Sequence, residues 1–403
     1  MISPDRLEPS EHDWLLAPPT RRVIEALEGA EPRSARFVGG CVRNALLGQP
    51  VSDIDIATTL LPERAAQALK AAGIAVHPTG IAHGTLTAVA NHQPFEITTL
   101  RRDVSTDGRR ATVAFTTDWD EDARRRDFTM NAIYAEPDGT LIDYVGGVED
   151  ALHRRILFIG RPEDRIAEDY LRILRFFRFY AWYAHGDPDQ EALAACVAMR
   201  DGLTQLSAER VWNETKKLLA AEDPRTALAA MDEAGVMAAL YGDLDRARLG
   251  RLVEMGEADA FLRFLALCPD DASGEALAQR MKMSNAEKDR LRAALDPELT
   301  EAVAREWQTR AGLEKLVYRT GNQAIADRLA LDFASVETPP EGWGGALAHA
   351  RSFETPEFPV TGADLLAAGV PKGPELGDSL RRLEDRWVDS RFALTKAELL
   401  QSL

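Results

Sequence analysis

The hydrophobic and polar positions of the first 150 residues follow two different periods. Short runs such as DIDIAT alternate polar and apolar residues, which indicates a strand with one buried face. VRNALLG and LPERAAQALKAAG instead have the helical spacing and end in glycine. RFVGG, GTLTAVA, PFEITTL and TLIDYVGG predict further strands, with a hairpin turn around Asn91, His92 and Gln93. This mixture predicts a mixed sheet with helices packed on one face.

After about residue 150 the strand pattern almost disappears. RIAEDYLRILRFFRFYAWYA, SAERVWNETKKLLAA, PRTALAAMDEAGVMAALYG and NAEKDRLRAAL all have the helical period. The proline-rich stretches VETPPEGWGG and FETPEFPVTG predict linkers within this helical half. The aromatic residues Trp182 and Trp212 are expected in its core. The chain is therefore expected to form a small α/β head followed by a long helical part.

Length and composition exclude several classes of protein. A chain of 403 residues is too long for one compact core, so about two to four domains are expected. The three cysteines lie far apart, which argues against a disulfide framework or a zinc site and favours a reducing compartment. The N-terminus lacks the pattern of a secretory signal, and no apolar run approaches the ~18 residues of a membrane span. We expect a cytoplasmic protein that does not contact a membrane.

The net charge of the chain and the local distribution of its arginines suggest different partners. Its net charge of −17 disfavours general binding to nucleic acid. Arginines are nevertheless concentrated in two stretches, residues 101–126 and 154–178. A local field of arginines on an acidic body can bind phosphates at one place and avoid indiscriminate RNA binding elsewhere.

The run SDIDIA contains the first candidate chemical group. Because alternate residues of a strand point to the same side, Asp53 and Asp55 project together while Ile54 and Ile56 enter the core. Paired carboxylates without imidazole suit Mg²⁺, and two such ions can assist phosphoryl transfer. A bare D-x-D is more often an exposed strand edge. Glu96 of PFEITTL is a candidate third carboxylate, and a solvent-facing glutamate is an equally good interpretation.

The residues before SDIDIA favour the chemical interpretation. Gly39 and Gly40 end a predicted strand and open a helix, which leaves backbone N–H groups available to phosphate oxygens. Arg43 lies in the first turn of that helix and adds a fork of donors. We therefore expect the aspartates to hold a metal-bound triphosphate.

A second constellation lies in AEDYLRILRFFRF, which is expected to form one continuous helix. Its charged residues, including Asp169 and Arg172, occupy one half of the helix, and its apolar residues the other. A solvent-exposed ion-pair face is one interpretation. A base reader is the other: Asp169 accepts from the exocyclic amine of cytosine or adenine while Arg172 donates to the ring. Such a reader would reject uracil and guanine, which present an oxygen to the carboxylate.

Taken together, these motifs resemble the class II tRNA nucleotidyltransferase and poly(A) polymerase family, most closely bacterial CCA-adding enzymes. The resemblance spans about residues 36–220 and the tail segment TGADLLAAGVPKGPELGDSLRRLEDRW. Its ordered motifs are GGCVRN, SDIDIAT, FEITTLRRD, DGRRATVAF, RRRDFTMNAIYA, DYVGGVEDALHRRILFIG, RIAEDYLRILRFFRF and SAERVWNETKKLL. It implies a polymerase-β-like head followed by all-α neck, body and tail. The expected segments are an N-terminal helical segment 1–35, the head 36–150, the neck 151–220, the body 221–350 and the tail 351–403.

The same resemblance implies roles for individual residues. It implies that Asp53 and Asp55 carry the metal ions, with Glu96 as a candidate third catalytic carboxylate. The implied nucleotide-binding residues are Gly40, Arg43, Arg126, Asp169, Arg172, Arg175 and Arg178. DGRRA is the flexible loop that assists the switch from C to A. The family usually has aspartate where this chain has Asn44, which puts a ribose or packing role there in doubt.

The implied reaction is template-independent addition of C, C and A from CTP and ATP to a tRNA that lacks its 3′ CCA. The tRNA 3′-hydroxyl attacks the α-phosphorus and pyrophosphate leaves, with Mg²⁺ as cofactor and Asp53 as candidate base. No obligate protein partner is evident. A poly(A) polymerase or an A-adding enzyme of the same family stays open, as do a small-molecule nucleotidyltransferase and a non-catalytic RNA-binding protein.

Overall fold

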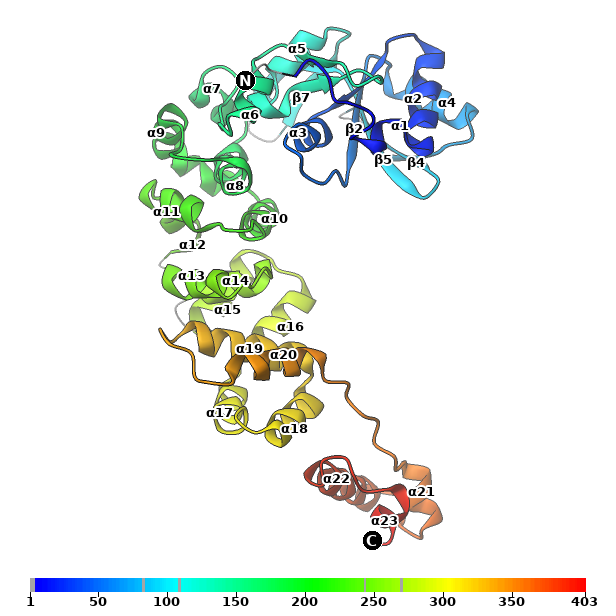
Figure 1. Ribbon diagram of the computed structural model, residues 1–403, viewed down its shortest axis with the longest axis vertical. Helices are drawn as coiled ribbons and strands as arrows, with labels where there is room; N and C mark the ends of the chain where they lie inside the picture. Colours follow the sequence, from blue (N-terminus) through cyan, green and yellow to red (C-terminus); the bar gives the residue numbers. More distant parts are fainter. Residues whose placement is uncertain (1–3, 82–83, 108–109, 243, 269–270) are drawn as a thin grey trace. The chain divides into compact units, whose positions relative to one another are not determined.

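The computed structural model describes residues 4–81, 84–107, 110–242, 244–268 and 271–403. The chain divides into two compact units, Met1–Gly242 and Asp243–Leu403. Figure 1 shows the sheet within the first unit, in blue and cyan, and helices throughout the second. The mixed head and helical remainder expected from the sequence are thereby confirmed. The split at Gly242 is coarser than the five expected segments, whose boundaries stay predictions.

The head is built on a seven-stranded sheet in the order β3-β4-β5-β2-β1-β8-β9. Strands β2 and β5 are parallel, and the other neighbours are antiparallel, so the sheet is mixed. Its strands are β1 (Ala35–Val38), β2 (Ile54–Thr58), β3 (Ala75–Gly80), β4 (Thr85–Ala90), β5 (Gln93–Thr99), β8 (Ile133–Ala135) and β9 (Leu141–Asp143). The expected hairpin joins β4 to β5, and Asn91 and His92 both have the positive φ of a tight turn.

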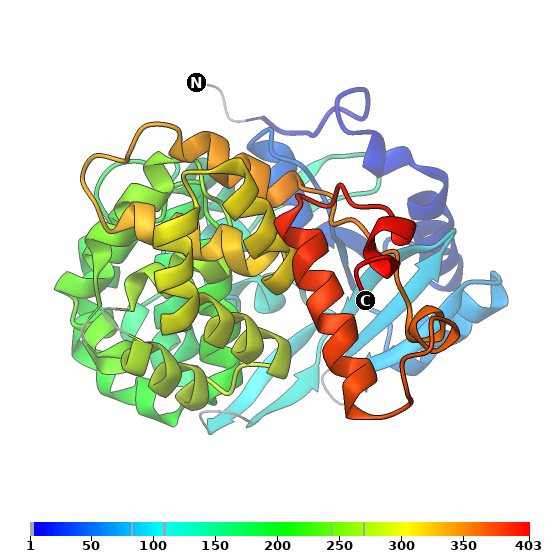
Figure 2. The ribbon, with the colours of Figure 1, turned by 90° about the horizontal axis from the view of Figure 1, so that it is seen from below.

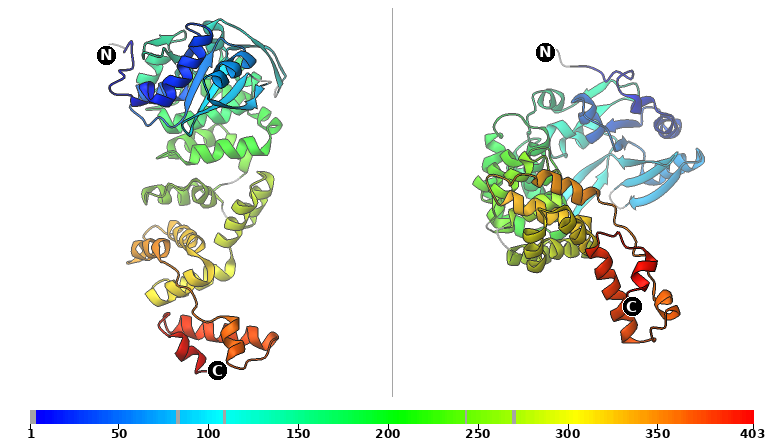
Figure 3. Two further views of the ribbon diagram at one scale, coloured as in Figure 1. Left: turned by 90° about the vertical axis from the view of Figure 1, so that its right-hand side faces the viewer. Right: turned by 60° about the horizontal axis from the view of Figure 1, so that its bottom comes forward.

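The core of the head forms where the apolar positions of these strands face the helices. Ile54 and Ile56 of β2 and Phe95 and Ile97 of β5 are 2% exposed or less. Helices α2 (Pro18–Ala30) and α4 (Pro62–Ala71) pack against each other and against strands β3 and β4 (Figure 3, left). Burial of these side chains removes the apolar residues of β2 and β5 from water and leaves the polar residues between them on the opposite face.

The arginine-rich stretch after residue 100 forms a second, two-stranded sheet that the sequence pattern did not predict. It consists of β6 (Arg101–Asp107) and β7 (Arg110–Phe115), paired as an antiparallel hairpin. DGRRA was expected to be a flexible loop, and its residues Gly108 and Arg109 lie outside the described residues. The remaining elements of the head are α1 (Asp13–Leu16), α3 (Gly40–Leu46), α5 (Trp119–Arg124), η2 (Thr129–Asn131) and α6 (Gly147–Leu152).

The helices that complete the first unit pack around an aromatic face of α8. These helices are α7 (Pro162–Glu168), α8 (Leu171–Tyr183), α9 (Gln190–Met199), η3 (Arg200–Gln205), α10 (Ala208–Leu219), α11 (Arg225–Glu233) and α12 (Val236–Tyr241). Phe176 and Phe177 of α8 are fully buried, and the ring of Phe179 lies 5.0 Å from the ring of Phe128 of the head, tilted by 47°. Helix α8 also packs on α10 and α11. The contact between Phe179 and Phe128 joins helix α8 to the head.

The expectation of one continuous helix through Asp169 and Arg172 is wrong. Helix α7 ends at Glu168, and Asp169 is extended, with φ −158° and ψ 106°. The Oδ1 atom of Asp169 accepts a hydrogen bond from the backbone N–H of Leu171 at 3.1 Å. The short polar side chain thus satisfies a donor at the start of α8, which favours a break over a continued helix.

The second unit is helical throughout its described residues. Its helices are α13 (Arg246–Glu254), α14 (Ala260–Leu267), α15 (Asp271–Arg280), α16 (Asn285–Ala294), α17 (Pro297–Glu306), α18 (Arg310–Thr320), α19 (Asn322–Ala334), α20 (Trp343–Ser352), α21 (Gly362–Ala367), α22 (Pro374–Asp389) and α23 (Lys396–Leu400). Figure 2 shows α22 as a long helix near the C-terminus. Leu365, Leu383 and Leu399 bring α21, α22 and α23 into one buried cluster. Across the described residues, no helix combines the length and apolarity needed to cross a membrane.

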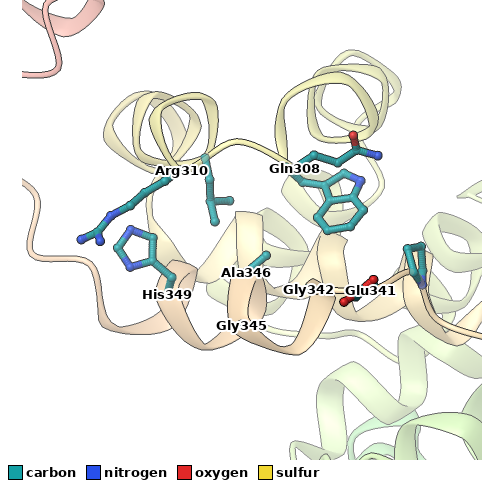
Figure 4. A pocket seen from close by; sticks show the side chains of 10 residues that line it. Gln308, Arg310, Glu341, Gly342, Gly345, Ala346 and His349 are labelled. Atoms are coloured by element: carbon teal, nitrogen blue, oxygen red, sulfur yellow. The ribbon is translucent and has the colours of Figure 1, made fainter.

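A cavity of about 650 Å³ lies in the second unit between α20 and the turn that joins α17 to α18 (Figure 4). Arg310 and His349 lie side by side at one end of it. Both are bonded to Glu314, from Arg310 Nε at 2.8 Å and from His349 Nε2 at 3.0 Å. The charged groups at this end therefore satisfy one another, and the paired aspartates of SDIDIA lie in the other unit.

Candidate active site

The carboxylates of the head come together where β2 and β5 run in parallel. In this register Asp55 is the direct partner of Glu96, so both side chains project from the same face of the sheet. Asp53 immediately precedes β2 and is exposed, whereas Asp55 is half-buried. The alternation that predicted Asp53 and Asp55 on one side also accounts for Glu96, because Phe95 and Ile97 are buried on the other side.

The turn from β1 into α3 passes directly beside Asp55. Gly39 has φ 71° and ψ −122°, a conformation that residues with a Cβ rarely adopt. A Cβ atom at Gly39 or Gly40 would lie 4.0 Å from Oδ2 of Asp55. The two glycines therefore allow the backbone to lie close to the Asp55 carboxylate. A ligand that contacts both the backbone and the carboxylate requires this closeness.

Arg43 is a buried cation whose acceptors, among the described residues, are neutral. Arg43 is only 6% exposed, and its guanidinium donates to Oδ1 of Asn131 at 2.5 Å. It also donates to Oδ1 of Asn44 at 2.9 Å and to the Tyr183 hydroxyl at 2.8 Å. Burial lowers the pKa of Arg43. A buried charge that lacks a carboxylate partner is costly, and an anionic ligand would offset that cost.

Asn44 is a neutral acceptor for Arg43, so it does not balance the positive charge of Arg43. The family-typical aspartate at this position would place a carboxylate where the Asn44 amide oxygen now accepts from Arg43. The Asn44 Nδ2 group instead donates to the backbone oxygen of Pro50 at 3.0 Å, a bond that an ionised aspartate cannot make. Asn44 thus ties the last turn of α3 to the segment before SDIDIA.

A cavity of about 310 Å³ joins these groups within the first unit. It is lined by Gly40, Cys41, Arg43, Asn44, Val51, Ser52, Asp53, Asp55, Arg178, Trp182, Tyr183 and Lys217. Residues from the head and from helices α8 and α10 therefore share one cavity, with carboxylates and cations on its walls. This combination suits a polyanion that is bound through metal ions, since each sign of charge has a partner.

The electrostatics of Asp55 favour a bound cation. Burial and the neighbouring charge of Glu96 raise the pKa of Asp55 to about 6, and the cation Arg126 opposes this rise. Crowding of carboxylates at one place is relieved when a divalent cation binds. Within the part of the chain that the structure describes, no three His, Cys, Asp or Glu side chains form a ready-made ion cage. Two carboxylates nevertheless fit Mg²⁺, which usually completes its shell with water and substrate phosphates.

Arg126 is held close to the carboxylates by a second buried acid. Its guanidinium bonds to Oδ2 of Asp122 at 3.0 Å, and its Nη1 lies 3.9 Å from the position of a Cβ at Gly39. Burial would raise the pKa of Asp122, but Arg126 and Arg125 outweigh it and hold that pKa far below its ordinary value. Arg126 is therefore fixed beside Asp55, although it is not among the residues that line the cavity.

A ladder of ion pairs links the head to α8. Arg175 donates from Nε to Oδ2 of Asp127 at 2.7 Å, and Arg178 donates from Nε to Oε2 of Glu214 at 2.6 Å. Arg175 Nη1 also lies 4.0 Å from Glu214. Arg175 and Arg178 are thus positioned by buried carboxylates, and Arg178 lines the cavity.

Asp169 lies in the break before α8 and Arg172 in the first turn of α8, and neither is among the residues that line this cavity. Asp169 Oδ2 accepts from Arg210 at 2.5 Å. Arg172 Nη1 donates to Glu168 at 2.6 Å, and its Nη2 donates to the backbone oxygen of Arg125 at 3.3 Å. The two groups of the expected base reader therefore have separate partners in this structure, although the second contact places Arg172 next to the segment that carries Arg126.

Comparison with known proteins identifies the family. Residues 35–157 match the model of the poly A polymerase head domain, and residues 187–247 match a probable RNA-binding site of polymerase A. The chain is 35% identical over 395 residues to the zebrafish (Danio rerio) mitochondrial CCA tRNA nucleotidyltransferase 1, covering 91% of this chain and 86% of that protein. It is 32% identical to the CCA-adding enzyme of Lacticaseibacillus paracasei, covering 95% and 94%.

The chain belongs to the CCA-adding tRNA nucleotidyltransferase family. The crystal structure of the Bacillus stearothermophilus CCA-adding enzyme in complex with CTP is similar to it, with a TM-score of 0.71, 28% identity and coverage of 93% and 94%. The chain is thus a nucleotidyltransferase, and its resemblance to the family in sequence extends to the whole fold. Nucleotidyltransferases of this family are generally dependent on a divalent metal.

Tyr183 and Lys217 line the cavity of this CCA-adding family member and were not singled out from the sequence. Tyr183 bonds to Arg43, and Lys217 lines the cavity from α10. The expectation that Trp182 lies in the core is wrong, because its side chain is 41% exposed at the cavity, whereas Trp212 is buried as expected. Trp182 occupies the polar side of α8, one turn after Arg178, and that position is the signal that the sequence offered.

Proposed function

We propose that this chain adds C, C and A, from CTP and ATP, to the 3′ end of a tRNA that lacks them, and that Asp53 and Asp55 are its catalytic carboxylates. The observation that carries this proposal is the cavity in which both aspartates face the buried Arg43 and Arg178. Relatives named as CCA tRNA nucleotidyltransferases and a similar structure in complex with CTP support the substrates.

The proposed metal is Mg²⁺, held by Asp53 and Asp55. When bound, Mg²⁺ supplies charge stabilisation to the attacking and departing oxygens of the phosphoryl transfer. Glu96, the direct neighbour of Asp55 across β5, is proposed to strengthen metal binding through its charge. Oxygen ligands without imidazole favour this ion over transition metals.

The chain's own cations hold the nucleotide in this proposal. Arg43 and Arg178 neutralise the triphosphate from two walls of the cavity, and Gly40 permits its close approach. Arg126 contacts the nucleotide from beside Asp55, and Arg175 supports α8 through Asp127. These groups are fixed by buried partners before the substrate arrives, so little reorganisation is needed on binding.

The reaction forms one bond and breaks another at the α-phosphorus. The oxygen of the tRNA 3′-hydroxyl bonds to the α-phosphorus, and the bond to the bridging oxygen of pyrophosphate breaks. The hydroxyl proton leaves at the same time, and Asp53 is proposed to help accept it. Asp53 is the more exposed of the two aspartates, which leaves it accessible to the incoming RNA end.

Base selection is assigned to Asp169 and Arg172. For this role the two side chains must leave Arg210 and Glu168, their present partners. The Asp169–Arg210 pair is partly exposed, and such pairs contribute only about 0–1 kcal/mol. The Arg172–Glu168 pair is more buried, so its loss must be offset by hydrogen bonds from Arg172 to the base. Cytosine and adenine each offer an amine donor to Asp169, whereas uracil and guanine offer an oxygen.

The rival functions differ in their use of CTP. A poly(A) polymerase or an A-adding enzyme uses ATP alone, and the curated relatives favour full CCA addition over both. A small-molecule nucleotidyltransferase has no use for a second helical unit of this size. A cytoplasmic location also stays part of the proposal, supported by three cysteines that are all buried.

The test is incorporation of single labelled nucleotides into a tRNA transcript that lacks CCA. The proposal expects CMP to be added first and AMP only after two C residues. Asp53→Ala should abolish incorporation while CTP binding, measured by titration, survives. Asp120→Ala, which removes an exposed carboxylate on α5, is the matched control and should retain activity. Incorporation of AMP without CMP would contradict CCA addition, and turnover by Asp53→Ala would contradict the catalytic assignment.

A further inference from the structure

Lys217 lies on α10 and lines the same cavity as Asp53 and Asp55. Its ammonium nitrogen is 3.9 Å from Oε1 of Glu214, which is a long contact, and its side chain is 62% exposed. The same carboxylate already accepts a 2.6 Å hydrogen bond from Arg178 and lies 4.0 Å from Arg175. Glu214 thus faces cations from three residues, so this wall of the cavity carries an excess of positive charge.

The backbone of Lys217 is fixed at the cavity while its ammonium group stays adjustable. The indole N–H of Trp182 donates to the backbone oxygen of Lys217 at 2.7 Å, which joins α8 to α10 beside the cavity. The flexible four-carbon stem of lysine can then direct its charge toward a ligand. The indole of Trp182 therefore helps to hold Lys217 at this position, although its ring is exposed.

The charges in the cavity are distributed unequally over its walls. Asp53 and Asp55 form the wall where the metal-bound α-phosphate reacts in the proposed function, and Arg178 and Lys217 come from α8 and α10. The remaining phosphates of a nucleoside triphosphate carry most of its negative charge and need cations apart from the reacting centre. Arg43 provides one such cation from the head, and Lys217 provides another from the neck.

We propose that Lys217 binds the outer phosphates of the incoming nucleoside triphosphate and the pyrophosphate that leaves. This inference rests on the proposed function and adds to it a residue for the leaving group. Because the pyrophosphate part is common to CTP and ATP, Lys217 acts equally on both and takes no part in base selection. Because Lys217 contacts both the nucleotide and the pyrophosphate product, its substitution changes KM for nucleotides and inhibition by pyrophosphate together.

The test compares Lys217→Gln, Lys217→Arg and Lys216→Gln. Lys216→Gln is the matched control because it removes the same charge from the adjacent residue. The ammonium group of Lys216 lies 5.2 Å over the Trp212 ring, and Lys216 does not line the cavity. Lys217→Gln should raise KM for CTP and for ATP by the same factor, about tenfold, and weaken pyrophosphate inhibition similarly. KM for tRNA should stay within twofold of the wild type. Lys217→Arg should recover most of the loss.

Direct titration of inorganic pyrophosphate with Mg²⁺ into the full chain separates this inference from the proposed function. That measurement needs no turnover, and Lys217→Gln should bind pyrophosphate about tenfold more weakly than the wild type or Lys216→Gln. Failure of the wild type to add CMP or AMP would overturn the proposed function. Equal pyrophosphate binding by Lys217→Gln and the wild type, or an equal loss in Lys216→Gln, would overturn the role of Lys217.

Discussion

Arg175 of α8 donates a hydrogen bond from Nε to Oδ2 of Asp127 in the head, at 2.7 Å. The other oxygen of Asp127 accepts from Nδ2 of Asn131 at 3.0 Å, and Oδ1 of Asn131 accepts from Arg43. These contacts form a continuous chain from α8, which carries Arg172 of the expected base reader, to Arg43 beside the aspartates that are proposed to bind metal. The two ends of a nucleotide would thus be held by groups that share one buried network.

Asp127→Asn tests this network. The substitution keeps the shape of the side chain but removes the charge that balances Arg175, so a buried ion pair is broken. We expect a loss of about 3–5 kcal/mol in the free energy of unfolding, measured with denaturant. Asp120→Asn is the control, since the Asp120–Arg124 pair is exposed and should change stability by at most about 1 kcal/mol. Equal small losses in both variants would contradict a structural role for Asp127.

The contribution of Asp127 should depend on pH. Burial would raise the pKa of Asp127, but Arg175 and Asn131 outweigh it and hold that pKa well below its ordinary value. A carboxylate of this kind stabilises the fold fully above about pH 4, its unfolded pKa, and the stabilisation is lost as the pH falls toward the folded pKa. The stability difference between wild type and Asp127→Asn should therefore shrink on acidification from pH 6 to pH 3. A constant difference over that range would show that charge is not the cause.

Glu96→Gln tests the third carboxylate. If the charge of Glu96 strengthens metal binding at Asp55, the variant should need about tenfold more Mg²⁺ for half-maximal CMP incorporation and should approach the wild-type rate at saturating Mg²⁺. Asp55→Asn should not recover at any Mg²⁺ concentration, because it removes a metal ligand. A Mg²⁺ dependence of Glu96→Gln that equals the wild type would identify Glu96 as a solvent-facing glutamate.

Arg43→Lys tests whether the buried guanidinium contributes more than a charge. Lysine keeps the charge but cannot donate to Asn131, Asn44 and Tyr183 while it also faces the cavity. We expect KM for CTP and ATP to rise by about tenfold to a hundredfold, as measured in steady-state incorporation assays. Arg22→Lys is the control, because Arg22 is an exposed residue of α2 that does not line the cavity, and it should leave both KM values unchanged. An unaltered KM in Arg43→Lys would reduce the role of Arg43 to charge alone.

Local pattern was sufficient to predict the strand that carries Asp55, because alternation of polar and apolar residues determines which side faces the core. It left the adjacency of Asp55 and Glu96 open, because that adjacency depends on parallel pairing of strands about 40 residues apart in the sequence. The break at Asp169 was also missed, since the apolar period continues through it and only the contact of its side chain with the Leu171 N–H interrupts the helix.

The cavity itself is a tertiary feature that no single segment encodes. Lys217 and Tyr183 belong to helices whose sequences show only ordinary amphipathic spacing. They become site residues because α10 packs on α8 and Tyr183 of α8 contacts Arg43 of the head. The β6–β7 hairpin was hidden for a different reason. Its charged residues obscure the strand period, and the run was interpreted through its arginines.

The central claim is that Asp53 with Asp55 and Asp169 with Arg172 act on one and the same nucleotide. Incorporation of each of the four labelled nucleotides into tRNA lacking CCA tests it most directly, with Asp169→Ala and Arg172→Ala compared with the wild type. The account predicts that both variants keep nucleotide transfer but lose selectivity, so that UMP and GMP incorporation rises relative to CMP and AMP. A uniform decrease for all four nucleotides with unchanged selectivity would contradict it.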